Sequence, residues 1–404
     1  MYLSLSWRNL WRNKRRTLIM AASVFFAVIL ASIMRSGQRG SYSFMIDSSA
    51  KIFTGYLQIQ GEGFWDNRSL DKSIDIPNQQ KELFEQIEEV TSVTPRLESF
   101  ALLSKGNSTK VAQVIGIDPT AEDEMTGLKS RIIEGSYINA QSDGLLVGKG
   151  LASRLKAEIG DSLVLYGMGY HGQTAAAKLP ISGIVDLPFE KMDNSIVYLE
   201  LKNSQHIYGT GNRVTSLSFM ISNVRYLDNI LTELYQIIDP DLVVMTWDEM
   251  MPELKQNIQV DNISGIIMLI ILYVVIGFGV FGTVMMMISE RRREFSILIS
   301  VGMKKKGLIF TTIIETILVS FLGVFAGVIG SLPLLYYLKN NPIYMAGEAA
   351  VAYEKLGIEP VMNFSTDEII FFSQAIAVLI IAIFSAIYPF LFIRKLKPVD
   401  GLRA

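Results

Sequence analysis

Four apolar stretches constrain the fold of this 404-residue chain more than any other feature. Each contains at most one charged residue, and they cover residues 18–34, 263–288, 307–337 and 369–393. A helix needs about 20 apolar residues to cross roughly 30 Å of hydrocarbon, so the last three stretches are long enough and the first lies at the lower limit. We therefore predict an integral membrane protein with transmembrane helices at 18–35, 263–288, 307–337 and 369–393.

Basic residues gather in the segments at one end of these predicted spans. Segment 1–17 has five Lys and Arg residues, segment 289–306 has six and segment 394–404 has four, whereas segment 338–368 has two. Cytoplasmic loops carry the excess of Lys and Arg in membrane proteins. We expect both termini and segment 289–306 in the cytoplasm, and residues 36–262 and 338–368 on the outer side.

Segment 1–17 is predicted to form an amphipathic interfacial helix, with Trp7 and Trp11 at the depth of the lipid headgroups. The alternative is a signal peptide. The apolar run that follows is longer than a typical signal-peptide core, and Ser32-Ile-Met-Arg35 offers no small-x-small cleavage site. We therefore expect an uncleaved anchor.

The region between the first two apolar stretches predicts a large α+β domain, because it alternates strand-like and helix-like segments. Residues 36–52 and 245–263 are expected to prolong the first two spans as stalks. Strands are predicted at 56–60, 100–103, 111–117, 145–148, 162–166, 178–185 and 195–201, and helices at 79–89, 150–158 and 227–238. The central part, 110–212, is the richest in strand, and its flanks, 36–109 and 213–262, mix strand and helix.

Segment 289–306 is short, strongly charged and enclosed by two predicted spans. Phe295, Leu298, Ile299 and Gly302 recur at i, i+3, i+4 and i+7, which predicts a helix with one apolar face, and basic residues flank it on both sides. Such a helix lies along a membrane surface. The alternative is a tight cytoplasmic turn whose basic residues only set the topology.

The motifs of this segment resemble those of a known family. Glu290-Arg-Arg-Arg-Glu-Phe295, then Leu298, then Val301-Gly-Met-Lys-Lys305 are similar to the signature of the FtsX-like permeases, in the MacB and LolC/LolE branch of ABC transporters. Further similar motifs run nearly from end to end: Trp7 to Leu18, Gly116-Ile-Asp-Pro119, Gly144 to Ala152, Gly160 to Leu163, Gly183 to Val185, Tyr388-Pro389 and Lys397 to Arg403.

The resemblance implies a set of parts and partners. Segment 289–306 would be a coupling helix on a cytoplasmic ATPase subunit, 110–212 a sabre-like part and 36–109 with 213–262 a porter-like part of the outer domain. A second permease copy or a paralogue would complete a dimer. The residues that we expect to contact the ATPase are Glu290, Arg291, Arg292, Glu294, Phe295, Leu298 and Gly302.

Nothing in the sequence argues for an enzyme. The chain has no cysteine, its two histidines, His171 and His206, have no neighbouring ligand pattern, and no stretch fits Gly-x-x-x-x-Gly-Lys-Ser/Thr. We therefore expect a non-catalytic subunit that binds no metal or cofactor itself, with ATP and Mg on the partner ATPase. We expect no nucleic acid among its partners.

Two further features are candidate sites. Gly167 to Gly172 is the predicted tip of a hairpin, either a plain turn or a docking tip that uses Tyr170 and His171. The resemblance implies a periplasmic chaperone as the docking partner, although the hairpin of LolC-type relatives is longer and contains proline. Glu315 is the one ionisable residue inside an apolar span, and the cost of exposing a carboxylate to lipid predicts that it faces protein or water. Small-residue faces at Gly277, Gly279 and Gly282, and at Gly323, Gly327 and Gly330, permit close helix packing; the resemblance implies a dimer contact there.

We predict the permease subunit of a mechanotransmission transporter in the bacterial inner membrane, which extracts lipoproteins from the outer leaflet of that membrane. MacB-like efflux, FtsX-like signalling to an outer partner, and a membrane-anchored adhesion or sensor protein are the alternatives. Acyl chains of the cargo would need an apolar slot beside the membrane lipids. The residues predicted to line this slot are Val28, Ile29, Ile33 and Met34 on one wall and Ile263, Ile266, Ile267 and Ile270 on the other.

Overall fold

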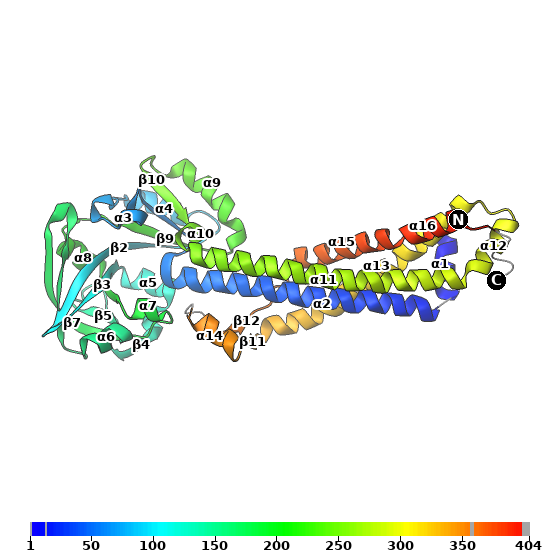
Figure 1. Cartoon of the computed structure of the whole chain (residues 1–404). Coiled ribbons are helices and arrows are strands. Elements are labelled where there is room, and N and C mark those ends of the chain that lie inside the picture. The colour runs from blue at the N-terminus through cyan, green and yellow to red at the C-terminus, as the bar shows by residue number, and fades with distance from the viewer. Residues whose placement is uncertain (1, 13, 356–358, 398–404) are drawn as a thin grey trace. The chain divides into compact units, whose positions relative to one another are not determined.

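The computed structural model describes residues 2–12, 14–355 and 359–397. These residues form two compact units. The helical unit comprises Met1–Tyr42, Asn257–Tyr344 and Val361–Ala404, and the α+β unit comprises Ser43–Gln256 and Met345–Pro360 (Figure 1). Residues 398–403, which carry part of the C-terminal family-like motif, lie outside the described residues.

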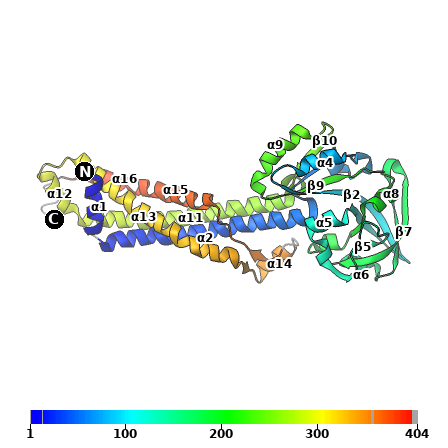
Figure 2. The same cartoon turned by 180° about the vertical axis from the view of Figure 1, so that it is seen from behind.

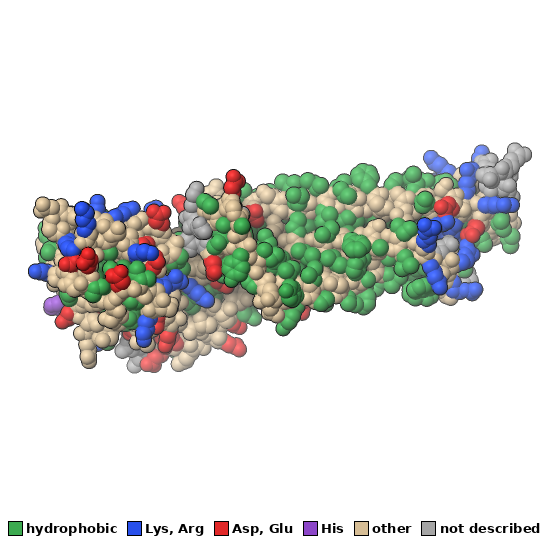
Figure 3. Space-filling view, turned by 90° about the horizontal axis from the view of Figure 1, so that it is seen from below, with side chains coloured by type: hydrophobic (Ala, Val, Ile, Leu, Met, Phe, Trp, Pro, Cys, Tyr) green, Lys and Arg blue, Asp and Glu red, His purple; other side chains and the backbone are tan. Residues whose placement is uncertain are grey.

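Within the described residues, four helices are long and apolar enough to cross a membrane: Lys14–Thr54, Pro252–Glu290, Lys305–Asn340 and Glu368–Lys395. The helices of the helical unit are α1 (Tyr2–Arg12), α2 (Lys14–Ser49), α11 (Pro252–Glu290), α12 (Arg292–Ser300), α13 (Lys305–Asn340), α15 (Glu368–Ser385) and α16 (Ile387–Lys395). Hydrophobic side chains cover the middle of this unit, and Lys and Arg side chains gather at the end that holds α12 (Figures 1 and 3).

Three helix boundaries differ from the predicted ones. The N-terminal helix ends at Arg12 and α2 begins at Lys14, so the predicted interfacial helix 1–17 is shorter. The first stalk leaves α-helical geometry at Ala50–Thr54, a π-helical turn closed by Gly55 at φ +73°. The second stalk does not begin at residue 245, because Leu242–Thr246 is a strand and α11 begins at Pro252. Proline favours the first turn of a helix, which explains this start.

Small residues on α13 bring α2 close to it within one chain. A Cβ added to Gly323 would lie 2.7 Å from the Cβ of Val24, and one added to Gly327 would lie 2.8 Å from the Cβ of Val28. The small-residue face of α13 is therefore filled by α2, and it is not free to form the dimer contact that the resemblance implied. Gly279 of α11 has no atom of the described residues within 4 Å of such an added Cβ.

The α+β unit is built on one ten-stranded sheet that closes partly into a barrel. Its strands are β1 (Leu57–Gly61), β2 (Val90–Lys105), β3 (Ser108–Ile117), β4 (Ile132–Gly135), β5 (Leu145–Gly148), β6 (Ser162–Met168), β7 (Thr174–Val185), β8 (Ile196–Glu200), β9 (Ser216–Ile221) and β10 (Leu242–Thr246). The order is β10-β1-β9-β2-β3-β8-β5-β7-β4, and β6 pairs with both β2 and β7. Strands β2, β3, β8, β5, β7 and β6 thus enclose a barrel, and buried apolar side chains fill it.

Strand β2 belongs to both parts of this sheet. Residues 90–96 pair with β9 in the open part, and residues 96–105 pair with β3 in the barrel. At the junction Arg96 is buried and its guanidinium forms a two-pronged ion pair with the Glu122 carboxylate, at 2.9 Å from Nε and 2.6 Å from Nη2. The predicted boundary at residue 110 falls inside β3, so it does not separate two folding units.

Helices and short helical turns connect the strands. They include α3 (Phe64–Asn67), α4 (Asn78–Glu85), α5 (Pro119–Thr126), α6 (Lys149–Leu155), α7 (Glu190–Asp193), α8 (Leu201–Tyr208), α9 (Leu227–Ile237), α10 (Trp247–Met250) and α14 (Glu348–Lys355). The predicted strands and helices are present within about four residues of their predicted ends, with one exception: the strand predicted at 100–103 is only the last part of β2, which begins ten residues earlier, at Val90. Strands β4, β9 and β10, and helices α5 and α8, were not predicted. Between α13 and α15 the described residues also form a short hairpin, β11 (Ile343–Tyr344) with β12 (Val361–Met362).

Candidate functional site

A buried ion pair lies at the basic end of the helical unit, where three helices meet. The Arg291 guanidinium, between α11 and α12, donates from Nη1 to Oε2 of Glu315 on α13 at 2.6 Å. The side chains of Arg291 and Glu315 are 7% and 2% exposed. A single buried carboxylate or guanidinium would be costly, so each residue depends on the other to be tolerated here.

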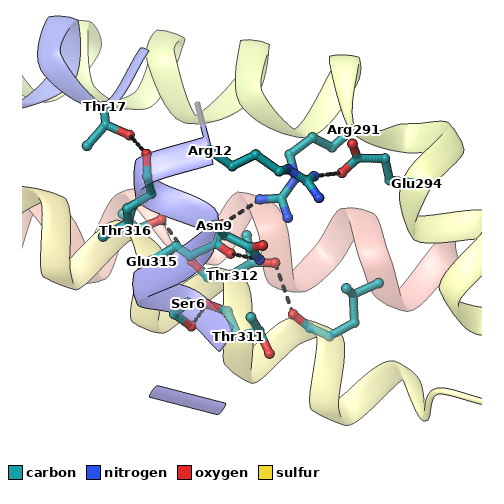
Figure 4. A network of polar contacts seen from close by, with 12 residues as sticks. Ser6, Asn9, Arg12, Thr17, Arg291, Glu294, Thr311, Thr312, Glu315 and Thr316 are labelled. Atoms are coloured by element: carbon teal, nitrogen blue, oxygen red, sulfur yellow. Dashed lines mark hydrogen bonds and ion pairs between the residues drawn. The ribbon is translucent and has the colours of Figure 1, made fainter. Parts of the chain in front are cut away.

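The N-terminal helix supplies the second partner of Glu315. Asn9 donates from Nδ2 to Oε1 of Glu315 at 2.6 Å, and the Ser6 hydroxyl donates to the Thr311 carbonyl at 3.0 Å. Helix α1 packs across α13 at this point (Figure 2), and Asn9, Arg291 and Glu315 point toward one another (Figure 4). Both carboxylate oxygens of Glu315 are thus satisfied by residues from other elements. We call Ser6, Asn9, Arg291, Thr311 and Glu315 the polar cluster.

Exposed ion pairs surround the polar cluster and connect α12 to the N-terminal helices. Arg12 of α1 pairs with Glu294 of α12 at 2.6 Å, and Arg16 of α2 pairs with Glu290 at the end of α11. Glu294 also accepts from Arg291 Nε at 3.3 Å. The Glu294 carboxylate therefore joins a buried cation to an exposed one.

Helix α12 ends in a glycine-dependent cap. Gly302 has φ +108°, its N–H donates to the Ile299 carbonyl, and the Met303 N–H donates to the Leu298 carbonyl. These two bonds are those of a Schellman motif, which needs a left-handed residue at its turn. Gly302 is therefore required by the end of the helix, and this role alone explains a glycine there.

The faces of α12 differ from the predicted apolar stripe. Phe295 is fully buried in the helical core and its ring lies 5.1 Å from the Arg291 guanidinium carbon, whereas Leu298 is 39% exposed. Ile297 and Val301, which the periodicity did not single out, are 45% and 82% exposed. Ile297 and Val301 are one turn apart, and with Leu298 they form an apolar surface at the C-terminal end of α12, where Val301 directly follows the helix.

The predicted ATPase contacts therefore divide into three groups by burial. Arg291 and Phe295 are buried, so the prediction that they contact a partner directly is wrong for this conformation; they hold α12 in place instead. Arg292 is half-buried. The residues on the surface are Glu290, Glu294, Leu298 and Gly302.

The two walls predicted for a cargo slot do not form one slot in a single chain. Val28 is buried against Gly327 of α13, so its assignment to the slot is wrong, and Ile29, Ile33 and Met34 are half-buried. Ile263, Ile266, Ile267 and Ile270 are exposed along α11. Near this level α2 and α11 are joined by polar contacts instead, including Arg35 Nη1 to Asn262 Oδ1 at 2.7 Å.

A different apolar hollow, of about 600 Å³, lies between α11 and α15. Tyr273, Phe278 and Phe281 line it on α11, and Ile380 and Phe384 line it on α15. Of the eight residues predicted for the slot, all of which are described, Ile270 is the one that lines this hollow.

The hairpin tip between β6 and β7 is folded back on its own domain. The backbone N–H of His171 donates to the Asp71 carboxylate at 2.8 Å, and the Arg213 guanidinium carbon lies 5.6 Å from the centre of the Tyr170 ring. Tyr170 is half-buried and His171 is exposed. The tip is a structured turn, and only His171 of the two predicted docking residues is presented fully. Among the described residues, no group of three His, Cys, Asp or Glu side chains could hold a metal ion.

Two family models match this chain. Residues 17–237 match the MacB-like periplasmic core domain, and residues 266–398 match the FtsX-like permease C-terminal domain. Among curated proteins, the lipoprotein-releasing system transmembrane protein LolC of Xylella fastidiosa is 21% identical over 332 residues, which cover 78% of each chain. The corresponding LolE of Haemophilus influenzae is 20% identical over 225 residues, 54% of each chain.

Two solved structures match part of this chain. The periplasmic region of MacB from Actinobacillus actinomycetemcomitans has a TM-score of 0.36 and 20% identity, covering 52% of this chain and 95% of that one. The extracellular domain of the ABC-type transporter YknZ from Gram-positive bacteria has a TM-score of 0.34 and 11% identity, covering 47% of this chain and 99% of that one.

Proposed function

Because this chain belongs to the family of ABC transporter permeases with a MacB-like periplasmic core domain and an FtsX-like C-terminal domain, we propose that it releases lipoproteins from the inner membrane. Its named relatives LolC and LolE, which are lipoprotein-releasing system transmembrane proteins, support this cargo class. The permease works with an ATPase subunit that binds ATP and Mg, and with a second permease copy or a paralogue.

The observation that carries the proposal is the attachment of α12 to both neighbouring spans. Arg291 directly follows α11, and it is paired with Glu315 on α13. A movement of α12 is therefore delivered to the second and third spans together. The excess of Lys and Arg at this end supports its placement in the cytoplasm, where the ATPase is.

The exposed surface of α12 fits a protein partner. Ile297, Leu298 and Val301 are apolar and accessible, and Arg293 and Lys304 lie exposed beside them. An apolar centre with a charged rim is the usual anatomy of a protein interface. Closure of the ATPase dimer would push this surface, and the buried polar cluster would prevent α12 from moving alone.

The cargo would enter between permease subunits. The row Ile263, Ile266, Ile267 and Ile270 is exposed on α11 and has no opposing wall within the described chain. Each buried methylene of an acyl chain is worth about 0.8 kcal/mol, so a second subunit facing this row would create a slot that retains lipid chains. The released lipoprotein would then pass to a periplasmic chaperone.

Photocrosslinking tests this proposal. A photoreactive residue at Ile267, in the complex with ATPase and second permease, should give adducts with a lipoprotein that disappear when ATP is supplied. A probe at Phe325 on α13, which is 58% exposed, serves as the matched control and should give phospholipid adducts whether or not ATP is present. If the probe at Ile267 also gives only phospholipid adducts, in amounts that nucleotide does not change, the lipoprotein cargo is refuted.

MacB-like efflux is the second candidate function, because residues 17–237 match the MacB-like core domain. An efflux permease should show ATP-dependent loss of small molecules from cells that express the complex, with no lipoprotein adducts. FtsX-like signalling would instead give ATP-dependent control of an outer partner without any adduct.

A further inference from the structure

A second site lies between α12 and α16, at the basic end of the helical unit. It is a hollow of about 360 Å³ with Arg292, Lys395 and Lys397 in its lining. Tyr388, Phe392 and Leu396 form part of its apolar and aromatic wall. The hollow thus combines three cations with an apolar, aromatic wall.

The three cations of the hollow have no acidic partner among the described residues, since none of them has a carboxylate within ion-pair distance. The Nε of Arg292 is buried and has no hydrogen-bond partner within the described part of the chain. Buried donors are almost always satisfied in proteins, and a cluster of like charges is stabilised by a bound counter-ion.

The position of the hollow selects the kind of anion. It lies where the apolar surface of the spans ends: Phe390 and Leu391 of α16 are exposed, and the next turns carry Lys395 and Lys397. Figure 3 shows Lys and Arg side chains gathered at this end beside the hydrophobic surface. An amphiphile with an anionic head matches this pattern better than an ion from bulk water does.

We propose that this hollow binds the phosphate group of an anionic phospholipid. Arg292 would offer its planar fork to two phosphate oxygens, and Lys395 and Lys397 would act as point charges on the remaining ones. The wall of Tyr388 and Phe392 would receive the glycerol and the first methylenes. Inorganic phosphate shares the head chemistry but not these apolar contacts. Because Arg292 opens α12, an occupied site would sit beside the coupling helix; placing it in the cytoplasmic leaflet rests on the proposed topology.

Native mass spectrometry of the full-length permease tests the site. The purified protein is titrated with phosphatidylglycerol and, separately, with phosphatidylcholine. The variant Arg292→Gln/Lys395→Gln/Lys397→Gln should lose about tenfold or more in affinity for the first phosphatidylglycerol, because three charge-assisted contacts are removed. Binding of phosphatidylcholine should not change.

The matched control removes the same charge at the same end of the molecule. Arg8→Gln/Lys14→Gln/Arg15→Gln should retain phosphatidylglycerol affinity within about twofold of the parent, because these exposed residues do not line the hollow. Arg292→Lys, which keeps the charge and loses the fork, should show a partial loss even if the triple variant fails to fold. Equal losses in both triple variants, or equal binding of the two lipids by the parent, would overturn the proposal.

Two further measurements identify the source of the phosphate and test whether the ATPase uses the same cations. Displacement of phosphatidylglycerol by inorganic phosphate, and not by chloride at equal ionic strength, would assign the site to free phosphate; failure to displace it would assign the site to lipid. Loss of ATPase copurification with full lipid binding in the hollow variant would show that the ATPase uses these cations, and the proposal would then be wrong.

Discussion

Arg291 and Glu315 are 24 residues apart in the sequence, and their side chains meet at 2.6 Å in a place that excludes water. The contact joins the end of α11 to α13 across the whole of α12. Because α12 is enclosed by this contact, it cannot change its tilt without displacing at least one of the two spans. The pair therefore ties α12 to both spans, and in the proposed mechanism it would also transmit movement between them.

Removing one partner of this pair should be more harmful than removing both. Glu315→Gln leaves the Arg291 charge buried without a counter-charge, which we expect to cost about 3–5 kcal/mol of folding free energy. The double variant Arg291→Met/Glu315→Leu should be closer to the parent, because no buried charge remains. Thermal unfolding of the detergent-solubilised protein measures both. A double variant as unstable as the single one would contradict this account.

The exposed pair of Arg12 and Glu294 should matter for coupling and little for stability. Glu294→Lys places a cation beside both Arg12 and Arg291. The Arg12 and Glu294 side chains are 56% and 47% exposed and Arg291 keeps its pair with Glu315, so the stability loss should be about 1 kcal/mol, well below that of Glu315→Gln. We expect ATP hydrolysis by the reconstituted complex to continue without cargo release. Adding Arg12→Glu restores the opposite charges and should restore release. Unchanged coupling in Glu294→Lys would remove Glu294 from the coupling mechanism.

The apolar surface of α12 should decide whether the ATPase binds. Val301→Asp places a charge at the most exposed residue of this surface, directly after α12, and the amount of ATPase that copurifies should fall about tenfold or more. Val111→Asp is the matched control, because Val111 is 63% exposed on β3 in the α+β unit. Copurification that is equal in the two variants would rule out Val301 as a contact residue.

Leucine at two glycines should distinguish packing within one chain from packing between chains. Gly327→Leu should destabilise the fold by about 1–3 kcal/mol or more, since its new Cβ would lie 2.8 Å from that of Val28. Gly279→Leu should leave the single chain as stable as the parent. If the face of α11 that carries Gly279 meets the second permease subunit, Gly279→Leu will reduce assembly in blue-native electrophoresis, whereas intact assembly would place the subunit contact elsewhere.

The sequence predicts best those features that depend on one continuous stretch of residues. Uniformly apolar runs predict spans, and a lone carboxylate such as Glu315 inside a span must find a partner within the protein. The identity of that partner could not be read, because Arg291 and Asn9 approach Glu315 only through the packing of three helices. The sequence places all basic residues beside the spans on the surface, but Arg291 is buried.

The periodicity of α12 was misleading for a related reason. A period of 3.6 identifies residues on one face, but it does not say which face is buried when apolar residues occupy more than one. Phe295 lies inside and Val301 lies outside, and only the geometry of the Arg291 turn decides between them. Likewise, single strands such as β6 and β7 were predictable from alternation, whereas the closure of the barrel depends on β6 pairing with two distant strands.

Strand β2 has a mechanical consequence for the α+β unit. Since one continuous strand is hydrogen-bonded to β9 along its first half and to β3 along its second, there is no flexible linker at which the open sheet and the barrel could hinge. The buried pair of Arg96 and Glu122 braces the point where the two halves join. A push on this unit would be passed on as rigid displacement and not absorbed by bending. Spin labels at Lys110 in the barrel and Tyr235 beside the open sheet should keep one narrow distance distribution through the ATP cycle; broadening on nucleotide binding would reveal a hinge.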